Sequence, residues 1–180
     1  MVTHVEIVLE TERLVLRPVT EADKADLIAL ERDPEVMRFL NGGRTQPPDE
    51  PDEDASYLTP RGHEPDVWAA VEKGSGSFVG WFSLRRGAEP GSAELGYRLR
   101  RAAWGRGYGS EGAKALVEAG FVRLRYKRIY AWTMAVNLAS RRVMEKAGLR
   151  YVRTVHLDLP DPLPGNEQGD VEYESTRGPP

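Results

Sequence analysis

A run of alternating glycines in the middle of the chain has the composition of an anion-binding loop. Gly105, Gly107 and Gly109 occupy every second position, and glycine lets a ligand approach the backbone because it has no side chain. A helical pattern begins directly afterwards, with Ser110 where an N-cap residue belongs. The start of a helix offers unpaired N–H groups and the positive end of the helix dipole. We therefore expect this segment to bind phosphate.

The charge around these glycines supports the same expectation. Arg98, Arg100, Arg101 and Arg106 lie in or next to the segment, and residues 95–110 contain no acid. The alternative is an ordinary strand-to-helix turn that merely needs glycine. Such a turn requires fewer than three glycines and gives no reason for the local density of arginine.

The same glycines also match a dinucleotide-binding fingerprint. Gly107, Gly109 and Gly112 fit the spacing G-x-G-x-x-G. That fingerprint requires a βαβ unit with an acidic residue about twenty positions further on, at the end of the next strand. The next expected strand, 128–133, contains no acid, and neither do residues 134–137. We reject a nicotinamide-dependent oxidoreductase as the first interpretation and keep it as a remote alternative.

A strand and an amphipathic helix must position this loop. Residues 94–99 alternate as a strand does. The helix predicted after the loop, from Ser110 to Arg125, separates apolar from charged residues on two faces. Its apolar face carries Ala113, Leu116, Val117, Gly120, Phe121 and Leu124, and its charged face carries Glu111, Lys114, Glu118 and Arg125.

The rest of the chain predicts further strands and helices around this unit. Thr20 and Asp23 resemble a capping box, so a helix that partly buries Ala22, Ala25, Leu27, Ile28 and Leu30 should follow, and Pro34 should start a short second helix. Trp68 and Trp81 are expected in the core rather than in a substrate pocket. The other expected strands are 12–18, 67–72, 77–86, 128–133, 151–159 and 169–175, and the last helix is 137–148.

Length and composition favour a single α/β domain over residues 1–180, with its core at about 12–175 and a frayed tail at 176–180. The net charge of −3 argues against a nucleic-acid or membrane-surface binder. No cysteine is present, and the three histidines have no metal-ligand spacing, so no metal is expected. The absence of an apolar span or signal sequence makes a cytoplasmic location the simplest expectation.

Residues 45–66 form an acidic, proline-rich stretch that differs in composition from the rest of the chain. A solvated loop is one interpretation. The other is an acidic lip that attracts a cationic substrate.

Two motifs carry a resemblance to a known family. The segments WGRGYGSEGAKALVEAGF, from Trp104, and NLASRRVMEKAGL, from Asn137, resemble the acyl-CoA-binding core of the GNAT N-acetyltransferases, RimJ/RimL-like branch. The resemblance covers about residues 12–158. The family's pyrophosphate signature, Gln/Arg-x-x-Gly-x-Gly/Ala, falls on residues 104–109, with Trp104 in place of the leading Gln or Arg.

The resemblance implies a fold, a reaction and a set of partners. The fold would be an α/β (α+β) domain, with a mixed, mostly antiparallel sheet splayed at its middle and flanked by helices. The reaction would move an acyl group, most simply acetyl from acetyl-CoA, to the primary amine of a protein N-terminus or a small molecule. A sensor or scaffold that binds acyl-CoA without turnover is the alternative, and a homodimer is an open possibility.

The resemblance also implies roles for individual residues. Glu94 would be the general base, Asn137 and Ser140 would face the pantetheine and its thiol, and a backbone N–H at Leu99 or its neighbours would polarise the thioester. Many relatives place a tyrosine acid where this chain has Met144, so the general acid stays open. The implied acyl-CoA contacts are Tyr97, Leu99, Arg100, Arg101, Trp104, Gly105, Arg106, Gly107, Tyr108, Gly109, Ser110, Asn137, Ser140 and Arg142.

Simpler interpretations exist for several of these residues. Glu94 could be an exposed strand carboxylate that pairs with a neighbouring arginine. Asn137 and Ser140 are common residues at the start of any helix. Arg142, expected near the 3′-phosphate or adenine of CoA, could equally belong to an exposed helix face.

Overall fold

The computed structural model describes residues 7–40, 66–158 and 160–177. Nearly all of the acidic stretch 45–66 and the last residues of the predicted tail lie outside the described residues. No structural statement is therefore made about the predicted acidic lip.

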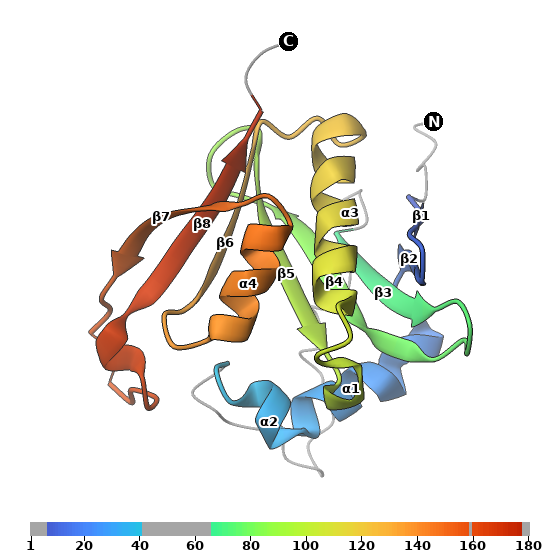
Figure 1. The fold of residues 1–180 in the computed structure, drawn as a ribbon, viewed down its shortest axis with the longest axis horizontal. Coiled ribbons are helices and arrows are strands. Elements are labelled where there is room, and N and C mark those ends of the chain that lie inside the picture. The colour runs from blue at the N-terminus through green and yellow to red at the C-terminus, as the bar shows by residue number, and fades with distance from the viewer. Residues whose placement is uncertain (1–6, 41–65, 159, 178–180) are drawn as a thin grey trace.

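One eight-stranded sheet forms the centre of the fold (Figure 1). Its strand order is β1-β2-β3-β4-β5-β6-β8-β7, and every neighbouring pair is antiparallel except β5–β6. The predicted mixed, mostly antiparallel sheet is thus confirmed. The strands are β1 (Leu9–Glu10), β2 (Leu14–Pro18), β3 (Val67–Glu72), β4 (Phe78–Arg86), β5 (Ser92–Leu99), β6 (Arg128–Met134), β7 (Arg150–Val155) and β8 (Asp170–Thr176).

The parallel pair β5–β6 opens into a gap, as the family resemblance implied. Its ladder joins only Ser92 to Arg128, Ala93 to Ile129 and Glu94 to Tyr130. Beyond these pairs β5 continues to Leu99 while β6 turns with β8, and Figure 1 shows the two strands separating. The sheet is therefore split at its middle, where the backbone edges of β5 and β6 no longer pair with each other.

Helices cover both faces of the sheet. The helices α3 (Tyr108–Val122) and α4 (Leu138–Lys146) lie on one face, and α1 (Lys24–Arg32) and α2 (Pro34–Met37) lie on the other (Figure 1). Two groups of buried side chains correspond to these layers: a large one beneath α3 and α4, and a smaller one that joins α1 and α2 to β3 and β4. Short 3-10 turns occur at Glu21–Asp23, Arg101–Ala103 and Asn166–Gln168.

Small residues let α3 lie close against the sheet. A Cβ atom at Gly112 would lie 2.3 Å from Phe82 Cζ, and one at Gly120 would lie 2.6 Å from Leu84 Cδ2. Both distances are shorter than carbon atoms tolerate, so the helix can occupy this depth only with glycine at these positions. The close packing fixes where the first turn of α3 lies relative to β4 and β5.

The structure corrects the predicted start of α3. The N-cap is Gly107, not Ser110, because Gly107 adopts a left-handed conformation (φ +83°) and its carbonyl accepts the Glu111 N–H at 3.0 Å. Ser110 is thus already inside the first turn. The helix also ends at Val122, three residues before the predicted end.

Two details near the N-terminus differ from the predicted pattern. The Thr20 capping box is confirmed, but a 3-10 turn precedes α1, and Ala22 and Ala25 are exposed. Asp23 is buried in their place because its carboxylate pairs with both terminal nitrogens of Arg17, each at 2.8 Å. Both predicted core tryptophans, Trp68 and Trp81, are buried.

Candidate functional site

The start of α3 has three backbone N–H groups without a partner in the helix. The first α-helical bond runs from Glu111 N–H to Gly107 O, so the amides of Tyr108, Gly109 and Ser110 have no partner within the helix. Gly105 (φ +70°) and Gly107 both have positive φ, so the turn brings the chain into the helix through a conformation that glycine adopts readily. This arrangement can accept a phosphate group.

The arginines near the loop are largely engaged by carboxylates. Arg98 Nη1 lies 2.6 Å from Glu31, Arg101 Nε lies 3.0 Å from Asp33, and Arg106 Nη2 lies 3.1 Å from Glu72. The density of arginine therefore has a structural cause that the sequence did not reveal. A phosphate bound at the loop would be held mainly by backbone amides. These guanidinium groups would contribute only where their carboxylate partners leave them accessible.

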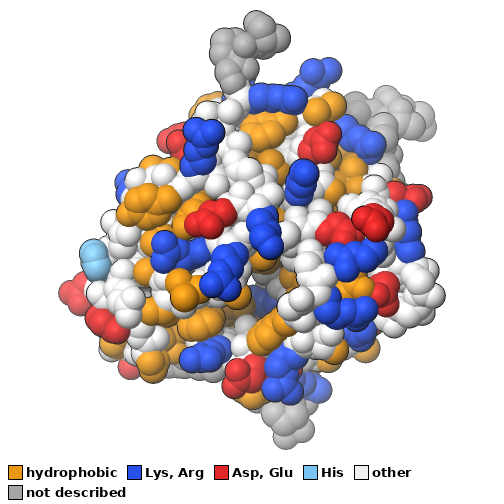
Figure 2. Space-filling model, viewed as in Figure 1, with side chains coloured by type: hydrophobic (Ala, Val, Ile, Leu, Met, Phe, Trp, Pro, Cys, Tyr) orange, Lys and Arg blue, Asp and Glu red, His pale blue; other side chains and the backbone are white. Residues whose placement is uncertain are grey.

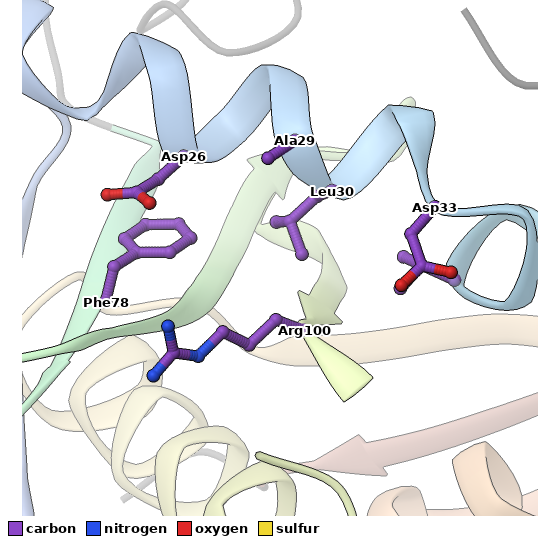
Figure 3. Close-up of a pocket in the computed structure, with 7 residues that line it drawn as sticks. Asp26, Ala29, Leu30, Asp33, Phe78 and Arg100 are labelled. Carbon is purple, nitrogen blue, oxygen red and sulfur yellow. The ribbon is translucent and has the colours of Figure 1, made fainter. Parts of the chain in front are cut away.

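Arg100 points to a different place. Its side chain lines a cavity of about 230 Å³ between α1 and β4, and its guanidinium lies beside the Phe78 ring (Figure 3). Among the described residues no carboxylate forms an ion pair with Arg100. The cavity is lined by Asp26, Ala29, Leu30, Asp33, Val36, Phe78 and Arg100.

The free edge of β5 carries amides that face the gap. Ser92 O accepts the Gly87 N–H at 2.9 Å and Val79 O accepts the Arg100 N–H at 3.0 Å, so even-numbered residues of β5 bond to β4. The alternation of a strand then directs the amides of Tyr97 and Leu99 toward β6. No β5–β6 pair lies beyond Glu94. These two amides are the donors that the split in the sheet exposes.

Tyr97 and Ser140 meet across this gap. The Tyr97 hydroxyl lies 2.7 Å from Ser140 Oγ and 3.0 Å from Ser140 O, and Asn137 Oδ1 accepts the Ser140 N–H at 3.2 Å as the N-cap of α4. Burial raises the pKa of the Tyr97 phenol, and its hydrogen bond to Ser140 opposes the rise. The phenol is consequently protonated at neutral pH and can donate a hydrogen bond.

Two aromatic residues of the predicted CoA set shape the loop. Trp104 is about half exposed (47%), and its Nε1 donates to Leu99 O at 2.8 Å. Tyr108 is buried, and its hydroxyl donates to the Glu72 carboxylate. Tyr108 therefore anchors the loop to β3 with its side chain and offers only its amide to a ligand.

Glu94 lies on β5 but on the opposite face from Tyr97. The two residues are three positions apart, about 10 Å along a strand. Glu94 is opposite Arg85 in the ladder with β4. Solvent reaches Glu94, yet desolvation by surrounding protein atoms raises the pKa of its carboxyl, and the charge of Arg85 lowers it by less. A carboxylate with a raised pKa is a better proton acceptor than an ordinary one.

The helix α4 does not provide a general acid at the position where many relatives have a tyrosine. Met144 is only 2% exposed and belongs to the core, so the usual tyrosine position is neither an acid nor open to the gap. Arg142 is exposed on α4. Its neighbour Arg141 is engaged by Tyr173 Oη at 3.1 Å and by Ala135 O at 3.0 Å.

The sequence did not reveal the residues whose side chains bond the glycine loop to the neighbouring strands. Glu72 on β3 bonds both Arg106 and Tyr108, and Arg13, in the turn just before β2, bonds both Arg106 and Glu111. The sequence pattern predicts only that Glu111 lies on the charged face of the helix, opposite its apolar face. A single sequence carries no signal for these pairs because their members are far apart along the chain.

The surface around the site is basic and hollowed. Figure 2 shows a hollow between α4 and the start of α3, with Lys and Arg side chains along its rim. Within the described ranges, no cluster of three or more His, Asp or Glu side chains could hold a metal ion. None of the helices described combines the length and apolar character that a membrane crossing requires.

The fold thus combines a sheet that is split between β5 and β6 with a helix start whose first amides have no partner in the helix. The family described as the acetyltransferase (GNAT) domain matches residues 13–150. The chain belongs to this family and is an N-acetyltransferase, and the family uses acetyl-CoA as co-substrate. This assignment replaces the nicotinamide-dependent and the non-catalytic alternatives.

Individual relatives agree with this assignment. The FsC-acetyl coenzyme A-N(2)-transacetylase of Aspergillus fumigatus is 33% identical over 178 residues, which cover 94% of this chain and 76% of that protein. A GNAT-family acetyltransferase from Bacillus anthracis has a TM-score of 0.78 at 23% identity, over 94% and 98% of the two chains. Spermidine N-acetyltransferase from Vibrio cholerae, solved with CoA and spermine, has a TM-score of 0.73 at 15% identity, over 92% and 96%.

Proposed function

We propose that this protein transfers the acetyl group of acetyl-CoA to the primary amine of a small molecule, by direct attack of the amine on the thioester. The observation that carries the proposal is the position of the three free amides of α3 at one end of the gap between β5 and β6. A ligand with a pyrophosphate at one end and an extended arm at the other fits such a site.

The pyrophosphate would be held by the amides of Tyr108, Gly109 and Ser110, with the helix dipole adding to the attraction. The pantetheine arm would extend along the edge of β5 toward Tyr97. There it meets backbone N–H groups of β5 that do not pair with β6. Acetyl-CoA supplies an activated acyl group whose thiolate is a good leaving group.

The same strand edge would stabilise the developing oxyanion. As the amine nitrogen attacks the carbonyl carbon, negative charge accumulates on the carbonyl oxygen. A fixed amide of Tyr97 or Leu99 would donate to that oxygen, which lowers the barrier because the donor needs no reorganisation. The carbon–sulfur bond then breaks, and the electron pair leaves with the sulfur.

The amine must lose a proton before or during attack, because an alkylamine with a pKa near 10 is mostly protonated at pH 7. Glu94 would accept that proton, directly or through water, from the face of the sheet that α1 and α2 cover. On the other face, Ser140 would donate a hydrogen bond to the departing sulfur while Tyr97 donates to Ser140. A thiol has a pKa near 8.5, so this help need only be small.

A small-molecule acceptor is favoured by the names of the relatives. The relative that is 33% identical is an N(2)-transacetylase, and one structural neighbour was solved with spermine. Placement in the RimJ/RimL-like branch, which would favour a protein N-terminus, rests on the motifs from Trp104 and from Asn137. An amine screen with acetyl-CoA distinguishes the two acceptor classes.

The screen measures free thiol released from acetyl-CoA with polyamines, amino acids, other small primary amines and N-terminal peptides. We expect thiol release with one or more small amines at rates well above hydrolysis without acceptor. Turnover with peptides alone would contradict the small-molecule acceptor. No turnover, together with no binding of CoA in calorimetry, would contradict the proposed function.

A further inference from the structure

We propose that Arg13 is a positioning residue for CoA: with Glu111 it holds the glycine loop in the shape that presents the three amides of α3 to the pyrophosphate. The inference rests on the proposed function, because it assigns the pyrophosphate to this loop. Arg13 lies in the turn between β1 and β2. In the strand order these two strands are at one end of the sheet, away from the split between β5 and β6.

One guanidinium group joins the two sides of the loop. Arg13 Nη1 donates to Arg106 O at 2.8 Å, which fixes the residue before Gly107. Arg13 Nε and Nη2 reach Glu111 Oε2 at 2.8 and 2.6 Å, which fixes the first turn of α3. The backbone N–H of Arg13 also donates to Glu111 Oε1 at 2.8 Å. The residues on both sides of Gly107 are thereby tied to one residue, Arg13, in the turn that joins β1 to β2.

Glu111 is held as a carboxylate at this position. The Thr11 hydroxyl donates to it as well, so one oxygen accepts bonds from Thr11 and from the backbone of Arg13. Desolvation raises the pKa of Glu111, but the bonds from Thr11 and Arg13 outweigh it and the net shift is downward. Glu111 therefore keeps its negative charge at neutral pH.

The bonds from Arg13 to Arg106 O and to Glu111 are needed because the loop is rich in glycine. Glycine loses more conformational freedom on ordering than any other residue, so an untethered loop would have to be ordered by the ligand. A loop fixed in advance binds more tightly because that entropy has already been lost. The side chain of Arg13 also stacks on the Tyr108 ring, 4.5 Å from its centroid, which holds the next residue of the loop.

Arg13 also controls the charge beside the phosphate site. A Cβ atom on Gly107 would lie 3.2 Å from Arg13 Nη2, so the guanidinium lies directly beside the loop. It neutralises Glu111, whose charge would otherwise repel a pyrophosphate at the same helix start. Loss of Arg13 should therefore weaken CoA binding in two ways, through a looser loop and through an uncompensated carboxylate.

The test compares Arg13→Gln with a matched control, Arg17→Gln on β2. Arg17 also makes a two-nitrogen pair, with Asp23, but far from the loop. CoA binding is measured by calorimetry, and amide hydrogen exchange is measured in the protein without ligand over residues 106–113, which hold the loop and the first hydrogen-bonded amides of α3. We expect Arg13→Gln to weaken CoA binding roughly tenfold and to speed exchange in the loop but not in β6. Arg17→Gln should change neither quantity.

Two further variants separate the parts of the inference. Arg13→Lys keeps the charge but cannot bond Arg106 O and Glu111 together, so its CoA affinity should lie between wild type and Arg13→Gln. It also carries the test if Arg13→Gln does not fold. Adding Glu111→Gln to Arg13→Gln should recover part of the lost affinity, because the uncompensated carboxylate is removed. No recovery would overturn the electrostatic part of the proposal.

Other results would overturn the positioning role itself. They are unchanged CoA affinity in Arg13→Gln, an equal loss in Arg17→Gln, or weaker binding with unchanged exchange in the loop. If the wild-type protein does not bind CoA, the proposed function fails, and hydrogen exchange alone decides whether Arg13 orders the loop. Faster exchange in Arg13→Gln would then support that ordering role, and unchanged exchange would overturn it.

Discussion

The Tyr97 hydroxyl lies 2.7 Å from Ser140 Oγ and joins β5 to the first turn of α4 at the level where β5 and β6 have separated. The bond places a protonated phenol behind the serine, on the side of the gap where the thiol of the donor is expected. At the position of the usual acid the sequence has Met144, which cannot donate a proton. The structure instead places the phenol of Tyr97, from β5, next to Ser140.

Removal of either hydroxyl should slow the reaction only modestly. Ser140→Ala and Tyr97→Phe should each lower kcat/KM by about tenfold, because a thiolate leaves without full protonation near neutral pH. Tyr97→Phe keeps the ring that packs against Phe82, so it should fold normally. Steady-state kinetics with the identified amine gives both values. If the double variant is no slower than either single one, the two hydroxyls act as one unit; a loss near a thousandfold in Ser140→Ala alone would contradict the minor role.

Replacement of the proposed base should cost more. Glu94→Gln should lower turnover by about 10²–10⁴-fold with little change in CoA affinity, because the amide cannot accept the proton. Stability should hardly change, since the side chain is reached by solvent. A Glu94→Gln enzyme as fast as the wild type would show that another group or a water chain is the base.

The pH dependence of kcat/KM tests the same residue. Glu94 must be ionised to accept a proton, and desolvation raises the pKa of its carboxyl despite the charge of Arg85. Activity should therefore fall as pH decreases through a value above the ordinary glutamate pKa of about 4.3. Arg85→Gln should move this limb to higher pH because it removes the charge that lowers the pKa. A limb that moves to lower pH would contradict the assignment.

A side chain at Gly107 should abolish tight CoA binding. Gly107→Val forces a β-branched residue into a conformation with φ of +83° and places its Cβ 3.2 Å from Arg13 Nη2. Gly74→Val is the matched control, because a Cβ there meets nothing within 4 Å. Calorimetry with CoA should show a large loss in the first variant and none in the second. Equal affinity in folded Gly107→Val would mean that the loop does not contact the pyrophosphate.

Restoring a phenol on α4 should not restore an acid. Met144 is 2% exposed, so Met144→Tyr inserts a larger, polar side chain into the core and should destabilise the fold by about 1–3 kcal/mol. Thermal unfolding should show a lower Tm, and kcat should not rise. A stable variant with faster turnover would show that this position reaches the thiol.

Much of the fold could be predicted because its signals are local. The alternation in β5, the glycine spacing and the apolar face of α3 depend on residues within a few positions of one another, and each was predicted near its observed place. Boundaries were less accurate. The start of α3 moved from Ser110 to Gly107, because glycine can cap a helix through its backbone conformation without a capping side chain.

The roles of the site residues remain predictions, but their placement shows what a sequence cannot provide. Arg98 and Arg101 were expected beside phosphate, yet they pair with Glu31 and Asp33. Arg100 was expected with them, yet it lines a cavity against α1. All three arginines lie on the side of the sheet that α1 and α2 cover, where the carboxylates of Glu31 and Asp33 come close to them only in the folded chain.

The sequence by itself determined the glycine-rich loop, the elements on either side of it and the family, and it predicted that the loop binds phosphate. Only the tertiary structure decided which side chains meet: Tyr97 with Ser140, 43 residues apart, and Arg13 with Glu111, 98 residues apart. Such pairs depend on strand order and on the depth at which α3 packs, which small residues such as Gly112 permit. Propensity and spacing act over a few residues, whereas these contacts arise from the packing of the whole sheet.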